Sequence, residues 1–218
     1  MAGTYEIRAV LAGKVCPFRG PDEPSAIAKS PLAGAVRIER LGLAGDEQAD
    51  LAVHGGPDKA IHHYPADHYA FWRGQLGDHP LLGRPGAFGE NVSTVDLVEN
   101  EVCLGDRFRL GTALVEVSQG RQPCWKQGHR LGDPQVTTTI VETGRSGWYY
   151  RVIEPGTVQA GDSLDHLDRP LPDWSVARAF RLLIGGGHKH DPAGLRALAA
   201  MELLATPWRR RAAQLLGA

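Results

Sequence analysis

The chain has 218 residues, of which 42% are hydrophobic and 22% are charged, and its formal net charge is −1. This balance is typical of a globular protein and excludes the strong basic field that proteins use to hold nucleic acid. No apolar run approaches the ~18 residues of a membrane helix and no signal-peptide pattern is present, so we expect a soluble, cytoplasmic protein.

The first two thirds of the chain carry short strand patterns separated by turns. Apolar and polar side chains alternate over residues 6–11, 35–40 and 113–117, and we predict a strand at each. Between them we predict a turn over residues 42–46 and a helix over residues 65–75, with Pro65 in its first turn. Short strands at this spacing predict a small β-barrel.

A Gly-Asp pair recurs in two similar segments, residues 102–110 and 158–167. We interpret each segment as a hairpin in which the glycine takes a positive φ and the aspartate bonds its local backbone.

The pattern changes after Arg169, where apolar side chains recur at helical spacing. Asp191-Pro192 and Thr206-Pro207 are typical helix starts, and three glycines after Ile184 end the helix that precedes them. We therefore predict two domains, a β-barrel over residues 1–169 and a three-helix unit over residues 170–218. The unit is too small to be stable alone and should dock on the barrel. The arginine run at 209–211 is interpreted as a solvated helix face, with an acidic partner as the alternative.

Cys124 is the main candidate for chemistry among three cysteines, an odd number that argues against a disulfide framework. It follows a predicted strand, and Arg121 and Lys126 lie close to it in sequence. Cationic neighbours favour the thiolate, which is the form that binds metals. A buried, inert cysteine is the alternative, and this segment alone does not decide between the two. Zinc would require further ligands that are absent nearby, whereas a metal held by its own cofactor would not.

A second candidate segment, residues 53–65, contains two glycines, a lysine and three histidines. Gly55 and Gly56 allow backbone N–H groups to approach an anion, and Lys59 adds a cation. A tight turn with a solvated lysine is the alternative.

The histidines and a downstream amide are weaker candidates. Because His62 and His63 would point to opposite faces of a strand, they cannot readily share a site, and we predict that His63 faces the pocket. Asn91 is interpreted as an amide that fixes the polar edge of a ligand, and a local backbone contact is the alternative.

Three motifs in this order resemble the MOSC domain family: residues 54–60 (HGGPDKA), 88–91 (FGEN) and 121–124 (RQPC). Residues 41–48, 63–65 and 144–148 resemble further signatures of the YiiM-like group within it, so the resemblance covers nearly the whole chain. It implies a mainly β fold with α, namely a distorted MOSC barrel of the pyruvate-kinase-barrel type with peripheral helices and a C-terminal three-helix unit.

The resemblance also implies binding of the molybdenum cofactor, a pterin dithiolene that carries a phosphate, with Cys124 as the molybdenum ligand. His63 is assigned to catalysis together with Cys124, as a residue that lines the pocket and passes protons. Other residues are assigned to cofactor binding: His54, Gly55, Gly56, Lys59, Asn91, Ser118 and Arg121. The family is further associated with pyridoxal phosphate binding.

The implied activity is the reduction of N-hydroxylated compounds, such as the toxic base analogue 6-N-hydroxylaminopurine, to amines. Molybdenum would take the oxygen of the N–OH group, and two electrons and two protons would then restore the metal and release water. Electrons would come from a separate flavin-type reductase, because the chain has neither an iron–sulfur cysteine cluster nor a dinucleotide fingerprint. No nucleic-acid or membrane partner is expected, and the oligomeric state is left open, with a homodimer as one alternative.

Two other functions compete with this one. The chain could be a sulfur carrier that holds a persulfide on Cys124, or a non-catalytic binding module that works through its C-terminal helices and arginine run. Metal content separates the enzyme from the carrier, and Cys124→Ala would leave a binding module intact.

Overall fold

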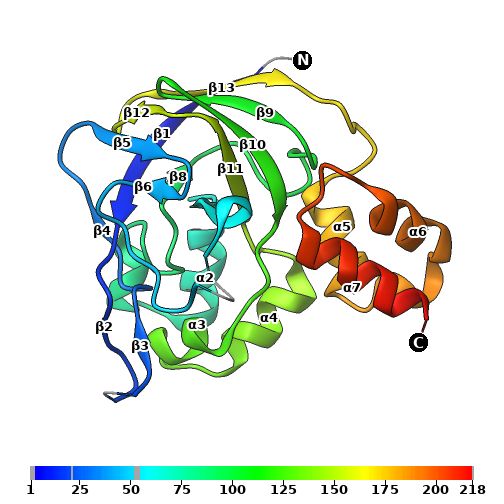
Figure 1. The fold of residues 1–218 in the computed structure, drawn as a ribbon. Helices are drawn as coiled ribbons and strands as arrows, with labels where there is room; N and C mark the ends of the chain where they lie inside the picture. The colour runs from blue at the N-terminus through cyan, green and yellow to red at the C-terminus, as the bar shows by residue number, and fades with distance from the viewer. Residues whose placement is uncertain (1–2, 21, 52–54, 218) are drawn as a thin grey trace.

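The computed structural model describes residues 3–20, 22–51 and 55–217. In these residues seven strands close into a mixed barrel (Figure 1), which confirms the predicted fold class. Around the barrel the order is β13, β9, β10, β11, β7, β8 and β1, and β1 pairs again with β13. All neighbours are antiparallel except β7 and β8. The barrel strands are β1 (Thr4–Ala12), β7 (Ile61–His63), β8 (Val92–Thr94), β9 (Arg107–Leu110), β10 (Ala113–Gly120), β11 (Trp148–Glu154) and β13 (Ser163–Asp168).

Short strands extend this framework. β4 (Ser30–Pro31) pairs with β1, while β12 (Gly156–Val158), β5 (Val36–Glu39) and β6 (Gly42–Leu43) form a separate sheet. β2 (Cys16–Pro17) and β3 (Pro24–Ser25) form a two-stranded sheet. The turn predicted over residues 42–46 is wrong in its first two residues, because Gly42 and Leu43 pair with β5 and the turn follows at residues 44–45.

Helices α2 (His68–Leu76), α3 (Trp125–Arg130) and α4 (Gln135–Thr143) lie at the lower end of the barrel in Figure 1. The helix predicted from Pro65 begins three residues later. The reason is tertiary: the Ala66 N–H donates to the Thr94 carbonyl at 2.8 Å, which keeps the chain beside β8 until Ala66. Two 3₁₀ helices, η1 (Pro57–Lys59) and η2 (Pro80–Gly83), complete this part.

The two Gly-Asp segments share a turn but are not hairpins, so that interpretation is wrong. Each glycine has a positive φ, 77° at Gly105 and 90° at Gly161. Each following aspartate accepts from a backbone N–H three residues upstream, at 2.9 Å for Asp106 and 3.0 Å for Asp162. However, β12 pairs with β5 and β13 pairs with β9 and β1, while residues 102–104 contribute only a bridge from Cys103. Strands that are distant in sequence form the backbone hydrogen bonds that the two arms of a hairpin would otherwise form with each other.

The C-terminal residues form α5 (Val176–Leu183), the 3₁₀ helix η3 (Gly187–His190), α6 (Pro192–Ala200) and α7 (Thr206–Leu216). As predicted, the Asp191 side chain caps α6 by accepting from the Gly194 N–H. For α7 the cap residue is Ala205 and not Thr206. No helix of the described residues is long and apolar enough to cross a membrane.

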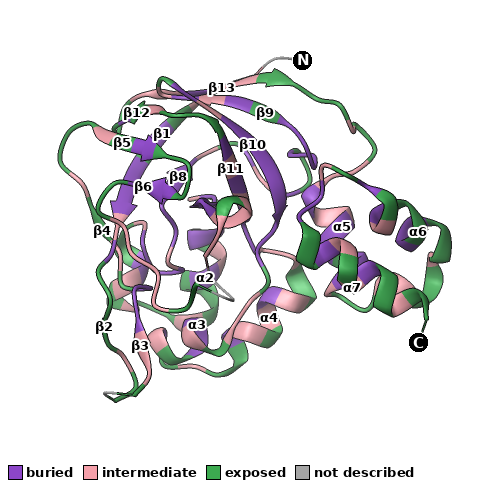
Figure 2. Ribbon diagram, in the orientation of Figure 1, coloured by how far each residue is buried: buried purple, intermediate pink, exposed green. Residues whose placement is uncertain are grey.

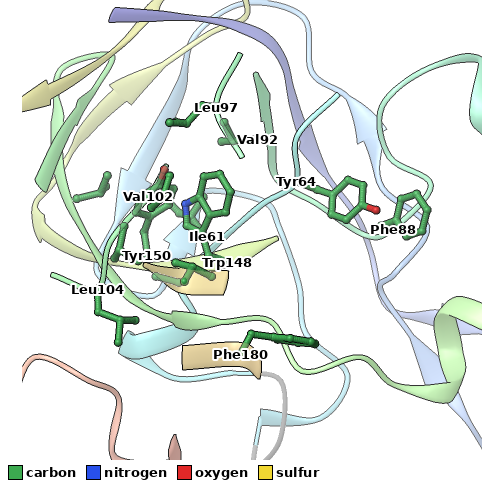
Figure 3. Packing of buried hydrophobic residues seen from close by; sticks show 14 of the residues in the cluster. Ile61, Tyr64, Phe88, Val92, Leu97, Val102, Leu104, Trp148, Tyr150 and Phe180 are labelled. Atoms are coloured by element: carbon green, nitrogen blue, oxygen red, sulfur yellow. The ribbon is translucent and has the colours of Figure 1, made fainter. Parts of the chain in front are cut away.

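One hydrophobic core joins the barrel to these helices. Figure 3 shows Phe180 of α5 below barrel residues such as Trp148 and Tyr150. Figure 2 shows buried residues on β10 of the barrel and on helices α5 and α7. α7 is fastened to β10 by the Ala205 N–H, which donates to the Ser118 carbonyl at 3.0 Å. The domain boundary at residue 169 stays a prediction.

Candidate functional site

Cys124 lies between the end of β10 and the start of α3, where it is the N-cap residue of the helix. Its backbone N–H donates to Oε1 of Gln127 at 3.3 Å, and the loop is tied to the barrel by the Arg121 N–H, which donates to the Gly147 carbonyl at 3.0 Å. The thiol is half-buried. It lines two neighbouring pockets, so a ligand on its sulfur would be reachable from both sides.

The first pocket, which we call the barrel pocket, is rich in basic side chains. Its lining includes Lys29, Lys59, His62, Asn91, Arg121, Cys124, Lys126 and Tyr149. Glu47 and Asp50 also line it, and Lys29 is neutralised by a buried ion pair with Asp46. The wall nearest Cys124 is therefore suited to an anionic or strongly polar ligand.

Arg121 gives the barrel pocket its most specific feature. The side chain is only 5% exposed, and its Nη2 lies 3.9 Å from the Cys124 Sγ. Its Nε and Nη1 have no hydrogen-bond partner among the described residues. Buried donors without a partner are costly and rare in native proteins. A ligand with acceptor oxygens would remove that cost.

Lys59 lines the same pockets as Cys124, and the short segment that contains it is held in place by neighbouring contacts. Gly56, at a φ of 94°, begins the η1 turn, and Arg151 donates to the Asp58 carboxylate at 2.8 Å. Burial, and secondarily the Arg121 guanidinium, lower the pKa of Lys59. Lys59 lines both pockets, whereas neither Gly55 nor Gly56 lines either of them. The remaining candidate of this segment, His54, lies outside the described residues.

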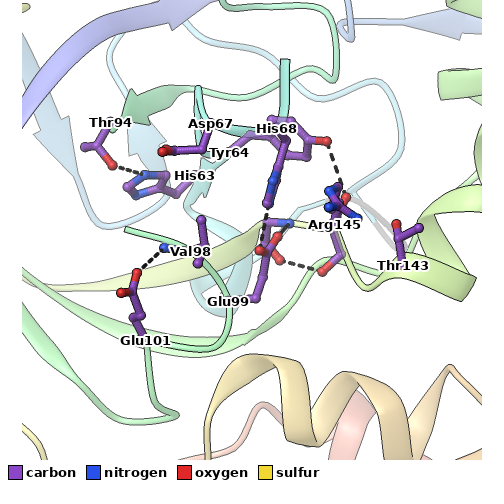
Figure 4. A network of polar contacts seen from close by, with 12 residues as sticks. His63, Tyr64, Asp67, His68, Thr94, Val98, Glu99, Glu101, Thr143 and Arg145 are labelled. Carbon is purple, nitrogen blue, oxygen red and sulfur yellow. Dashed lines mark hydrogen bonds and ion pairs between the residues drawn. The ribbon is translucent and has the colours of Figure 1, made fainter. Parts of the chain in front are cut away.

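The prediction that His63 faces the pocket is wrong, because His62 lines the barrel pocket and His63 does not. The His63 ring is fully buried inside the barrel, 2.9 Å from the Thr94 hydroxyl (Figure 4) and 3.0 Å from the Tyr150 hydroxyl. Burial lowers the pKa of His63 to about 3. The two rings do lie on opposite faces of β7, as expected. The face that carries His63 is turned into the barrel interior, and the face that carries His62 lines the barrel pocket.

Asn91 and Ser118 make hydrogen bonds within the protein, and the cofactor contacts assigned to them stay predictions. The Asn91 amide donates to the Leu11 carbonyl at 3.1 Å and to the Asp46 carboxylate at 2.8 Å, which uses both of its hydrogens. Its oxygen accepts from the His62 N–H at 3.1 Å, so Asn91 holds His62 at the pocket.

The Ser118 hydroxyl lies 2.6 Å from the Asp58 carbonyl and 3.0 Å from the Tyr149 carbonyl, and Ser118 does not line the pockets at Cys124. Ser118 therefore positions η1 and, through it, Lys59.

Sequence reasoning missed Tyr149 and His62 as residues of the site. Tyr149 lines both pockets, and burial is the main cause that raises its pKa, so its hydroxyl keeps its proton at neutral pH. The motif at residues 144–148 directly precedes Tyr149 and was a signal for it. His62 could have been found only from the barrel geometry.

The second pocket, which we call the α7 cleft, separates the Cys124 loop from the last helix. It has a volume of about 300 Å³. Its lining residues are Lys59, Gln119, Gln122, Pro123, Cys124, Tyr149, Pro207, Trp208, Arg211 and Gln214. Trp208 packs so closely against β10 that a Cβ at Gly120 would lie 2.8 Å from its ring. The cleft therefore depends on the C-terminal helices being docked.

Comparison with known proteins identifies similar chains. A family model described as the MOSC domain matches residues 50–165. The YiiM protein of Escherichia coli is 45% identical over 171 residues, 78% of this chain and 75% of that protein. A protein named reductase from Gibberella moniliformis is 39% identical over 165 residues, 75% of this chain and 29% of that protein. The crystal structure of YiiM from Geobacillus stearothermophilus superposes with a TM-score of 0.80 at 31% identity, over 97% of this chain and 99% of that one.

Proposed function

The chain belongs to the MOSC domain family and to its YiiM-like group, and we propose from this that it is an oxidoreductase that reduces N-hydroxylated compounds with the molybdenum cofactor held at Cys124. Family membership and the similarity to a protein named reductase support the oxidoreductase class. A single observation supports cofactor binding: two buried nitrogens of Arg121 have no hydrogen-bond partner among the described residues, and the guanidinium lies beside the half-buried Cys124 thiol.

The residues at the barrel pocket fit such a cofactor. Cys124 offers a soft sulfur ligand, which suits a transition metal whose other ligands belong to its own cofactor. Arg121 would donate its free N–H groups to the phosphate or polar edge of the pterin, and Lys59 would add a second cation. When bound, the cofactor would supply the two-electron reduction that converts an N–OH group into N–H.

Two side chains are placed to handle the protons that this reduction consumes. Tyr149 holds its hydroxyl proton, because burial raises its pKa. His62 is neutral at pH 7, because burial lowers its pKa, and its Nε2 has no partner among the described residues. We assign to His62 the pocket role that the sequence suggested for His63.

We further propose that the protein works in the cytoplasm and receives electrons from a separate flavin-type reductase. The sequence supports an external donor, because it contains neither a dinucleotide fingerprint nor an iron–sulfur cysteine cluster. 6-N-hydroxylaminopurine is the reference substrate for this activity.

A sulfur carrier with a persulfide on Cys124 is the alternative. A carrier needs an accessible thiol, which the half-buried Cys124 provides. It does not need buried, unpartnered guanidinium groups beside that thiol, so Arg121 favours the cofactor enzyme.

Elemental analysis of protein from a host that makes the cofactor tests the proposal. We expect about one molybdenum per chain in the wild type and in Cys16→Ala, whose exposed cysteine is the control, and none in Cys124→Ala. The loaded wild type should then reduce 6-N-hydroxylaminopurine when coupled to a flavin reductase. Equal molybdenum in all three proteins would refute Cys124 as the ligand, and a persulfide without molybdenum would favour the carrier.

A further inference from the structure

The α7 cleft meets the barrel pocket at Cys124. Lys59, Cys124 and Tyr149 line both, whereas Arg121 lines only the barrel pocket. If the cofactor's polar part binds at Arg121, the α7 cleft remains open to a second molecule that approaches Cys124 from the other side. A volume of about 300 Å³ is at the lower end of the range for small-molecule pockets.

The positive charge of the α7 cleft favours an anionic ligand. Lys59 and Arg211 are its two cationic lining residues, and no described residue that lines it is acidic. The Arg211 Nε donates to the Leu183 carbonyl at 2.6 Å, which fixes the guanidinium against the end of α5. Its terminal nitrogens make no other hydrogen bond within the described residues. A fixed guanidinium of this kind is well suited to phosphate or carboxylate.

Gln119 adds a second requirement. Its side chain is 2% exposed and lines the cleft, and its Nε2 donates to the Gly120 carbonyl at 3.2 Å. Its Oε1 has no hydrogen-bond partner in the described parts of the chain. A buried acceptor of this kind is normally satisfied, so the cleft calls for a ligand that donates an N–H.

We propose, resting on the proposed function, that the α7 cleft is the substrate site and that it takes N-hydroxylated compounds carrying an anionic group. Arg211 binds the anionic group, and Gln119 accepts from the substrate's N–H. The last helix is thus a specificity element of the enzyme, and a phosphorylated substrate is preferred to its neutral counterpart.

The test compares the reduction of N4-hydroxycytidine with that of its 5′-monophosphate. We expect wild-type protein to show a kcat/KM at least about tenfold higher for the monophosphate, the size of one charge-assisted contact. Arg211→Gln should abolish this preference by lowering kcat/KM for the monophosphate to about the value for the nucleoside. Arg210→Gln removes the same charge from an exposed position of α7 and should keep the preference. Gln119→Leu should raise KM for both compounds alike.

Two further measurements separate this inference from the proposed function. Cytidine monophosphate should bind more tightly than cytidine in calorimetry, and Arg211→Gln should remove the difference whether or not the protein is an active reductase. That result without any reduction of N–OH would keep the cleft assignment and reject the reductase. Absence of a phosphate preference in wild-type protein, or loss of molybdenum in Arg211→Gln, would overturn the cleft assignment, since the latter would place the cofactor's own phosphate there.

Discussion

At the scale of single residues, the site depends on a cation placed beside a thiol. Arg121 has two buried nitrogens without a partner among the described residues, and this is tolerable only if a ligand supplies acceptors. We predict that Arg121→Gln lowers molybdenum retention about tenfold or more after dialysis, while Arg121→Lys retains part of it. Arg109→Gln, which removes a surface partner of Glu154, is the control and should retain the wild-type content. Full retention in Arg121→Gln would contradict the anion-binding role.

His63 leads to a prediction about acid stability. Its pKa is about 3 in the folded protein, because the ring is buried, and about 6.5 in an unfolded chain. Between these values the unfolded state binds a proton that the native state does not, so stability falls as pH falls through this window and is unaffected above it. The loss attributable to His63 is about 2 kcal/mol at pH 5.

Urea unfolding at pH 7 and pH 5 measures this effect. In His63→Asn the stability difference between the two pH values should be about 2 kcal/mol smaller than in wild-type protein. His190→Asn, at an exposed position of η3, should leave the wild-type difference unchanged. An unchanged difference in His63→Asn would mean that this ring titrates normally.

At the scale of elements, the two Gly-Asp turns are alike in backbone geometry and unlike in surroundings. Asp106 is fully buried, accepts from Cys103, and pairs with Arg169 at 2.7 Å. Asp162 is only half-buried and accepts from the Gln159 N–H. The same turn therefore anchors the loop to the C-terminal segment in one place and only shapes a surface turn in the other.

The same substitution at Asp106 and at Asp162 should change the free energy of unfolding by different amounts. We expect Asp106→Asn to lower the free energy of unfolding by about 2–3 kcal/mol, because Arg169 loses its counter-ion. Asp162→Asn should cost less than about 1 kcal/mol, because an amide oxygen can still accept from Gln159. Chemical unfolding of both variants beside wild type provides the measurement, and equal costs would show that the turn itself, and not the ion pair, dominates.

At the scale of the whole molecule, the C-terminal helices share one core with the barrel. Backbone hydrogen bonds also join them to the first 169 residues, among them those from Ala205 to Ser118 and from Val176 to Val102. We predict a single cooperative unfolding transition, with coincident curves from far-UV circular dichroism and from tryptophan fluorescence. A chain ending at Arg169 should not fold, because it leaves the apolar surface under α5 and α7 uncovered. Two separated transitions, or a folded truncated barrel, would show instead that residues 1–169 form an independent domain.

The sequence by itself determined part of the local structure and named the candidate residue, Cys124, around which the proposed site is built. Period-two alternation marked β1, β5 and β10, and cap and breaker residues marked α5 and α6, because these signals act over a few neighbouring residues. The ordered motifs pointed to the fold and to Cys124, since motif order survives without knowledge of contacts.

Only the tertiary structure decided which candidates line a pocket. Alternation placed His62 and His63 on opposite faces, but the closure of the barrel decided which face is interior. Ser118 is occupied by a partner 60 residues away and Asn91 by one 80 residues away, distances over which a sequence pattern carries no signal. The α7 cleft arises in the same way, because packing Trp208 onto the end of β10 places Arg211 and Cys124 on one cleft. Side-chain roles are settled by the competition for hydrogen-bond partners and buried space, and that competition exists only once the chain is folded.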